Sequence, residues 1–148
     1  MKRLFLALAA LPLIAAAPTE RWLQISASDA AHGAMALNLS AVQPSQTKGL
    51  DDAVAMEVVD PKTVWLTHYE VRCGRGLMHQ VERRALDPKT GKPGAVAPTV
   101  GDWAKPQGDG EARLLDIVCR PEAAGGDVIH DRRAMIWLLS RPAAPTAA

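Results

Sequence analysis

The sequence predicts an α+β domain, with an antiparallel sheet of about six strands and one or two helices packed on one face. Alternation of apolar and polar residues dominates the first two-thirds of the chain after residue 17, as in strands with one buried face. An amphipathic segment with helical spacing then runs to Cys119. The chain has two cysteines, Cys73 and Cys119, so one disulfide can tie this helix to the sheet.

Five segments carry the strand pattern, each bounded by residues that favour turns. They are Trp22 to Ser28, Ala34 to Ser40, Ala53 to Val59, Val64 to Cys73, and Leu77 to Leu86. A polar connection from Gln43 to Gly49 separates the second segment from the third, because its proline and glycine interrupt regular structure. We therefore expect the last three segments to form two consecutive hairpins.

Two turns define the expected register of these hairpins. Asp60-Pro61-Lys62-Thr63 suits a type I turn, with Asp at the first position and Pro at the second. A four-residue loop there gives the pairs Val59–Val64 and Val58–Trp65. A two-residue loop at Gly74-Arg75, with Gly74 at positive φ, gives the pairs Val71–Met78, Tyr69–Gln80 and Trp65–Arg84.

The two registers agree on the residues of each face of the sheet. The expected buried face carries Val54, Met56, Val58, Trp65, Tyr69, Val71, Cys73 and Met78. The expected outer face is mixed and hence partly wet, and carries Ala55, Glu57, Leu66, His68, Glu70, Arg72, Leu77, His79, Val81 and Arg83. Because Cys73 belongs to the buried face, a disulfide to Cys119 would hold the helix against that face.

The last third of the chain begins with a turn and an irregular stretch. The tetrapeptide Asp87 to Thr90 repeats the residues of the first turn. The stretch from Gly91 to Gly110 is rich in Gly and Pro, which predicts a winding surface segment with Trp103 as its anchor.

Two helical segments follow. Asp109 is expected to cap the first helix, which Pro121 ends, and its apolar arc is Leu114, Leu115, Val118 and Cys119. The stretch from Asp127 to Ser140 fits a second helix, although Met135 to Leu139 equally fits a buried strand.

Residues 1 to 17 carry the three zones of a secretory signal peptide. Lys2 and Arg3 precede an apolar run from Leu4 to Ile14, which is too short to span a bilayer and is followed by three alanines. Cleavage is expected after Ala16. We therefore expect export to the periplasm or the cell surface without a transmembrane anchor, a single domain over residues 18–140 and a disordered tail over 141–148.

Export affects the expected charge and the expected state of the cysteines. Removing two of the 17 basic residues with the leader changes the formal net charge from +1 to −1, so nucleic acid is not an expected partner. An oxidising compartment favours a disulfide between Cys73 and Cys119. Two cysteines at this spacing also exclude a CxxC redox pair and a four-cysteine zinc site.

Several short segments together suggest a family. They are Trp22-Leu23-Gln24-Ile25, Asn38-Leu39-Ser40, Val71-Arg72-Cys73, Trp103 and Leu115-Asp116-Ile117-Val118-Cys119. In this arrangement the chain resembles the surface-adhesin protein E-like domains of bacterial envelopes over about residues 20 to 120. The resemblance implies an antiparallel sheet with a helix fastened across it, and adhesion to host matrix proteins. Unlike a lipid-anchored protein, this chain has no cysteine near the expected cleavage site.

One group of side chains on the expected outer face has the composition of a metal site. In the expected register Glu70 lies opposite His79, and His68 lies diagonal to it. Two imidazoles and a carboxylate suit zinc or copper with an open coordination position. The alternative is a Glu70–His79 ion pair on a solvated face, with His68 unrelated.

Arginines near the Gly74 hairpin form an expected basic patch: Arg72, Arg75, Arg83 and Arg84. Such a patch can bind an anionic polymer or an acidic partner, or it can serve only solubility and edge protection. In the expected register Arg84 also stacks over Trp65.

The sequence contains no GxSxG, HExxH or phosphate-loop motif, so we expect a protein that is not an enzyme and has no cofactor. Two functions remain. The first is an envelope binding or adhesion module for a macromolecular partner, such as a host matrix or envelope protein. The second is a small periplasmic effector or inhibitor of an enzyme, similar to lysozyme inhibitors, which would use a protruding loop such as Gln43 to Gly49 or Gly91 to Gly110.

Overall fold

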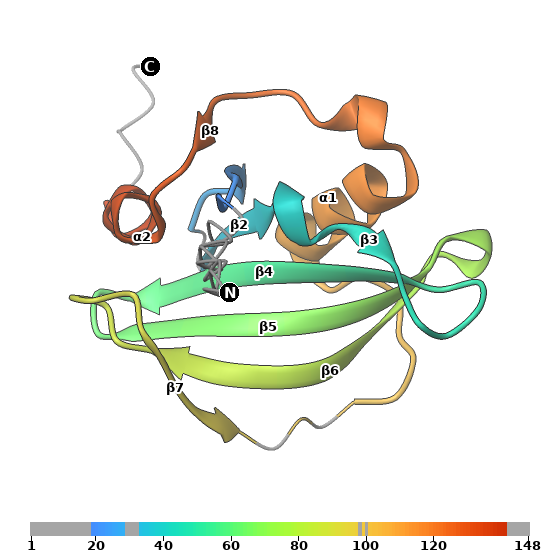
Figure 1. The fold of residues 1–148 in the computed structure, drawn as a ribbon, viewed down its shortest axis with the longest axis horizontal. Coiled ribbons are helices and arrows are strands. Elements are labelled where there is room, and N and C mark those ends of the chain that lie inside the picture. The colour runs from blue at the N-terminus through green and yellow to red at the C-terminus, as the bar shows by residue number, and fades with distance from the viewer. Residues whose placement is uncertain (1–18, 29–32, 98, 100, 142–148) are drawn as a thin grey trace, which may run out of the picture.

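A computed structural model describes residues 19–28, 33–97, 99 and 101–141, which form an antiparallel sheet with two helices (Figure 1). The strands are β1 (Trp22–Ser26), β2 (Ala34–Asn38), β3 (Gln43–Pro44), β4 (Asp51–Asp60), β5 (Thr63–Arg72), β6 (Leu77–Leu86), β7 (Pro93–Ala97) and β8 (Val128–Ile129). The helices are α1 (Gly108–Cys119) and α2 (Arg132–Leu139). The predicted fold class is confirmed, with eight strands where about six were expected. The expected signal peptide and nearly all of the expected tail lie outside the described residues.

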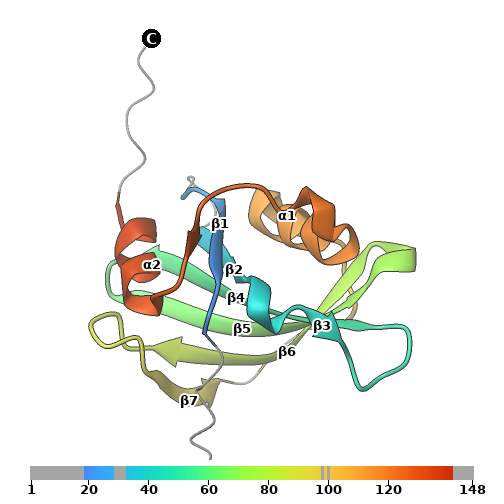
Figure 2. The same ribbon diagram turned by 45° about the horizontal axis from the view of Figure 1, so that its top comes forward.

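The strand order is β7-β6-β5-β4-β2-β1-β8, and the short β3 pairs with β4 beside this path. Strands β4, β5 and β6 have ten residues each and form the centre of the sheet. Figures 1 and 2 show α1 and α2 toward opposite ends of these long strands. No helix among the described residues has the length and apolar character needed to cross a membrane.

Both Asp-Pro-Lys-Thr segments form turns in which the Asp side chain accepts backbone N–H groups. Asp60 Oδ1 accepts from Lys62 at 2.7 Å and from Thr63 at 2.9 Å. Asp87 makes the same two bonds with the residues two and three positions further on. These backbone hydrogen bonds hold the pKa of each carboxyl group below its ordinary value. The predicted turn chemistry is therefore confirmed at both places.

The predicted register between β4 and β5 is wrong by one residue. Asp60 pairs directly with Thr63, and the next pair is Val58 with Val64. Val59 is thus an extra residue in β4, a β-bulge, and its side chain is 48% exposed. The sequence pattern missed the bulge because Val59 is as apolar as its neighbours.

A second bulge interrupts the hairpin of β5 and β6. Near the turn the register agrees with the prediction, since Val71 pairs with Met78. Beyond Val81, which has no partner across the ladder, Trp65 lies opposite Ala85 and not opposite Arg84. The turn also differs, because Gly76 and not Gly74 has the positive φ, at 61°.

The two bulges change which residues share a face, and the predicted grouping of Met56 with Tyr69 is wrong. One face, here called the α1 face, packs against α1 through Ala53, Ala55, Tyr69, Val71 and Met78, among others. The opposite face, the α2 face, packs against α2 through Met56, Val58, Val64 and Leu86, among others. Met56 is fully buried as expected, but Trp65 is only half-buried and lies on the α1 face. Each helix thus covers a different face of the sheet, and the prediction that the helices pack on one face is wrong.

Helix α1 is held to the sheet by the predicted disulfide. Cys73 and Cys119 are bonded, with their Cα atoms 5.4 Å apart. The helix begins two residues earlier than expected, since Gln107 and not Asp109 is the N-cap residue. Glu111 Oε2 accepts a hydrogen bond from the Gln107 N–H at 2.7 Å. Gly110 lies so close to β2 that an added Cβ would be 2.4 Å from the Met35 sulfur. A larger residue there would force the Met35 side chain to move.

The apolar arc of α1 is partly as predicted. Leu114 and Val118 are buried, whereas Leu115 and Cys119 are half-buried. Ile117 is buried as well, although it was not in the predicted arc.

The structure decides between helix and strand near the C-terminus. Asp131 caps α2 by accepting the backbone N–H groups of Arg133 at 2.7 Å and Ala134 at 3.1 Å. Met135, Ile136 and Leu139 are buried against the α2 face, so this segment is a helix. The strand in this region is the short β8, which pairs with β1.

Candidate functional site

The three residues of the expected metal site contact different partners. Glu70 lies opposite His79, as predicted, but its carboxylate accepts a hydrogen bond from the Ser45 hydroxyl at 3.3 Å. His68 Nε2 lies 3.3 Å from Asp52 Oδ1. The His79 ring lies 5.5 Å from that of Trp103. In the described part of the chain, no group of three or more His, Cys, Asp or Glu side chains is placed to hold a metal ion.

The expected basic patch is divided between separate contacts. Arg72 lies over the Trp103 ring at 4.4 Å, which helps to anchor the irregular segment before α1. Arg84 pairs with Glu82. Arg83, and not Arg84, lies over Trp65, because the bulge in β6 shifts the register by one residue. Arg75 is exposed in the turn after β5.

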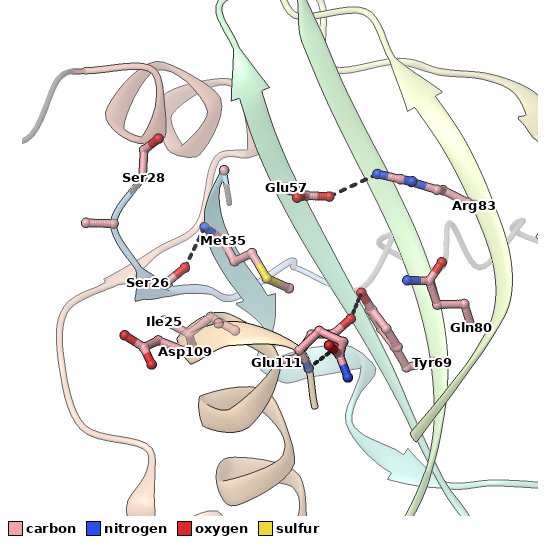
Figure 3. A pocket seen from close by; sticks show the side chains of 14 residues that line it. Ile25, Ser26, Ser28, Met35, Glu57, Tyr69, Gln80, Arg83, Asp109 and Glu111 are labelled. Carbon is pink, nitrogen blue, oxygen red and sulfur yellow. Dashed lines mark hydrogen bonds and ion pairs between the residues drawn. The ribbon is translucent and has the colours of Figure 1, made fainter. Parts of the chain in front are cut away.

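A pocket of about 560 Å³ opens on the α1 face, beside the first turn of α1 (Figure 3). Its walls come from the end of β1, the start of β2, the middle of β4 to β6 and the N-terminal turn of the helix. The side chains that line it include Met35, Glu57, Tyr69, Gln80, Arg83 and Glu111. A smaller pocket of about 190 Å³ shares Tyr69, Gln80 and Glu111 with it and extends the groove toward Ala104.

Tyr69 and Glu111 form the wall of the pocket between the sheet and the helix. The Tyr69 hydroxyl donates to Glu111 Oε1 at 3.3 Å, while the other oxygen of this carboxylate accepts the Gln107 N–H. Burial raises the pKa of Tyr69, and the negative charges of Glu111 and Glu57 raise it further. Tyr69 is thus a neutral hydroxyl at every physiological pH.

Glu57 and Arg83 form the opposite wall. Arg83 Nη2 lies 2.9 Å from Glu57 Oε2, and the guanidinium carbon lies 4.4 Å from the centre of the Trp65 ring. Figure 3 shows the Glu57 and Arg83 side chains extending toward each other across the strands. The Arg83 Nε atom is buried and has no hydrogen-bond partner among the described residues.

The pocket combines an apolar surface with more negative than positive charge. Met35 and Ile25 contribute apolar surface. The pocket is lined by three carboxylates, those of Glu57, Asp109 and Glu111, and by one guanidinium, that of Arg83. Four of its titratable groups form two pairs within the wall, Tyr69 with Glu111 and Glu57 with Arg83. Such a pocket can recognise a group by shape, hydrogen bonding and charge.

Sequence reasoning did not identify this pocket. Arg83 was singled out only as part of a basic patch, and Glu57 only as a residue of the outer face. The capping pattern around Glu111 indicates the helix start, but no local pattern predicts its contact with Tyr69, 42 residues away.

No family model, curated protein or solved structure matches this chain with significance.

Proposed function

We propose that this protein is an exported, non-catalytic binding module of a bacterial envelope, and that the pocket beside Tyr69 receives a side chain of a macromolecular partner. The observation that carries the proposal is the pocket itself. It has a volume of about 560 Å³ and lies between the long central strands of the sheet and a helix fastened by a disulfide. The leader-like residues 1–17 and the disulfide support export. The resemblance to surface-adhesin E-like domains supports a role in adhesion.

Binding explains the arrangement of the wall better than catalysis does. General acid or base catalysis needs a group whose pKa lies near the working pH and which can reach the substrate proton. Here Tyr69 has a raised pKa, Glu111 accepts two hydrogen bonds, and Glu57 is paired with Arg83. These contacts hold the side chains in place, which lowers the entropy lost when a partner binds.

The charge of the pocket favours a partner group with a positive charge on an apolar stem. A lysine or arginine side chain fits this description, because its methylene groups can contact Met35 while its head lies near Glu111. Like-charge repulsion would disfavour an acidic side chain at the same place.

The test is capture of partners from envelope extract and from host matrix proteins, with quantification by mass spectrometry. Gln80→Trp fills the pocket, and Gln46→Trp places the same side chain on an exposed loop away from it. We expect the natural protein and Gln46→Trp to capture the same partner. Gln80→Trp should fail to capture it. A partner retained by Gln80→Trp would contradict the role of the pocket.

One observation favours the second function, an inhibitor of an envelope enzyme. The loop between β3 and β4 projects from the sheet (Figures 1 and 2) and is braced by its own backbone, since Ser45 N–H donates to Leu50 O at 3.0 Å and Leu50 N–H donates to Thr47 O at 3.1 Å. A braced loop of this kind can enter a cleft. The stretch Gly91 to Gly110 is less suited, because β7 pairs with β6 and Ala104 forms a bridge to Met78. In the capture experiment, loss of an enzyme partner in Gln46→Trp alone would favour this second function.

A further inference from the structure

Three segments meet at the end of the sheet where α2 lies: the bulge and turn of residues 59–63, the turn of residues 87–92, and α2 with its flanks, residues 131–141. The first two adjoin because Val64, directly after the first segment, pairs with Leu86, directly before the second. The second adjoins α2 because Arg132 Nη1 donates to Gly91 O at 2.9 Å. Figures 1 and 2 both show this arrangement at the same end of the molecule. We call it the α2 end.

The α2 end carries exposed positive charge. Its exposed cationic residues are Lys62, Lys89, Lys92, Arg133 and Arg141. A further cation, Arg132, is paired with Glu20. The acidic residues on the three segments are Asp60, Asp87 and Asp131, and each uses its carboxylate to accept backbone N–H groups of its own turn or helix. The cations therefore outnumber the acids, and the acids are turned toward the backbone.

The same end exposes apolar side chains. Trp137 on α2 is 60% exposed, and Val59 in the bulge is 48% exposed. Arg133 precedes Trp137 by four residues, so the two share one side of α2. Arg141 lies just beyond the end of α2, and its guanidinium lies over the Trp137 ring at 3.4 Å. The exposed indole thus has one cationic side chain on its ring and a second on the same side of the helix.

We propose that the α2 end docks the protein on the surface of an anionic phospholipid membrane. Tryptophan favours the membrane interface, where its ring lies at the depth of the headgroups. Clustered lysine and arginine side chains are attracted to anionic headgroups. Binding at a membrane interface strengthens with the apolar area buried and with electrostatic attraction to anionic lipids, and the α2 end offers both. An acidic protein surface would be bound by the charges alone and would leave the exposed indole unexplained.

The proposal is independent of the pocket beside Tyr69. That pocket lies on the α1 face, whereas α2 covers the opposite face. A protein docked through α2 would therefore keep the pocket free for a partner.

The experiment is co-sedimentation of the processed protein, purified from a periplasmic fraction, with phosphatidylglycerol/phosphatidylcholine vesicles and with phosphatidylcholine vesicles. We expect binding to the anionic vesicles only, weakened by salt. Each neutralised lysine is expected to lower the partition coefficient about fivefold, so Lys89→Gln/Lys92→Gln lowers it about 25-fold. The matched control Lys48→Gln/Lys105→Gln makes the same change of net charge at exposed residues elsewhere and is expected to leave binding within about twofold.

The indole supplies a second readout. We expect the anionic vesicles to shift the tryptophan emission to shorter wavelength in the natural protein and not in Trp137→Phe. Without vesicles, the natural protein and Trp137→Phe should have the same melting temperature. Absence of binding to anionic vesicles would overturn the proposal, and so would equal weakening by the two lysine pairs, which would show an effect of net charge alone. Binding to immobilised polyglutamate without binding to vesicles would identify an acidic protein as the partner and overturn it too.

Discussion

The Tyr69 hydroxyl in β5 donates a hydrogen bond to Glu111 Oε1 in the first turn of α1, at 3.3 Å. The last residue of the same helix, Cys119, is bonded to Cys73 at the end of β5. Helix α1 is thus fastened to one strand at both of its ends, by a hydrogen bond at the start and by a covalent bond at the finish. These two contacts fix the position of α1 against the sheet beside the pocket.

Tyr69→Phe removes the hydrogen bond and keeps the packing of the ring. We expect the free energy of unfolding to fall by about 1 kcal/mol, because a typical intramolecular hydrogen bond contributes that much. Urea unfolding monitored by circular dichroism measures it. Tyr69→Ala also leaves a cavity and should cost about 3–5 kcal/mol. Equal effects of the two changes would mean that the hydroxyl, and not the ring, accounts for all of the stabilisation.

Stability at alkaline pH should depend on Tyr69. Its pKa in the folded state is raised above the ordinary value of 10.0, so the folded protein keeps the phenolic proton that the unfolded chain loses. The contribution of this group is fully present below pH 10 and is lost as pH rises from there toward the folded pKa. Unfolding measured from pH 8 to pH 11 should show a steeper decline for the natural protein than for Tyr69→Phe. Parallel curves would contradict a raised pKa.

Removal of the disulfide should destabilise the fold strongly. The cysteines are 46 residues apart, and the chain-entropy model assigns about 4 kcal/mol to closing a loop of this size. We expect Cys73→Ser/Cys119→Ser to lose about that amount, measured by denaturant unfolding. Peptide mapping without reductant should recover residues 73 and 119 in one cross-linked fragment. Finding both thiols open to alkylation in the folded, exported protein would refute the attachment of α1.

Met56→Asp should unfold the domain. Met56 has no exposed surface and contacts the core beneath α2, so an unpaired carboxylate there costs several kcal/mol. The control is Gln24→Asp, a change to the same residue at an exposed position of β1, which should be nearly silent. The neighbouring Glu57 is unsuitable as a control, because it pairs with Arg83. Circular dichroism melting curves separate the outcomes, and a folded Met56→Asp would place this residue outside the core.

Zinc should not stabilise the protein. His68, Glu70 and His79 each have a different neighbour, and a ligand at 100 times its dissociation constant would add about 2.7 kcal/mol if the three formed a site. Melting curves with and without excess zinc at pH 7.5 measure the effect. A rise in melting temperature that His79→Ala abolishes and His130→Ala preserves would restore the metal hypothesis.

Local patterns in the sequence predicted much of this protein. Aspartates at the first position of Asp-Pro-Lys-Thr predicted both turns, and their side chains do accept the N–H groups that close them. Alternation predicted five of the six strands that have five or more residues, and missed β7. The pair of cysteines in a chain with a leader predicted the disulfide. Each of these features depends on residues close in the chain or on the number of one residue type, so a single sequence contains the necessary information.

Only the tertiary structure decided which face each residue occupies. The side-chain period of a strand is two, so the single extra residues at Val59 and Val81 move all later residues to the other face, and nothing in their chemistry distinguishes a bulged valine from a paired one. For this reason Arg83, and not Arg84, lies over Trp65. The pocket beside Tyr69 depends on the same shifts and on a contact between residues far apart in the chain, which no local pattern encodes.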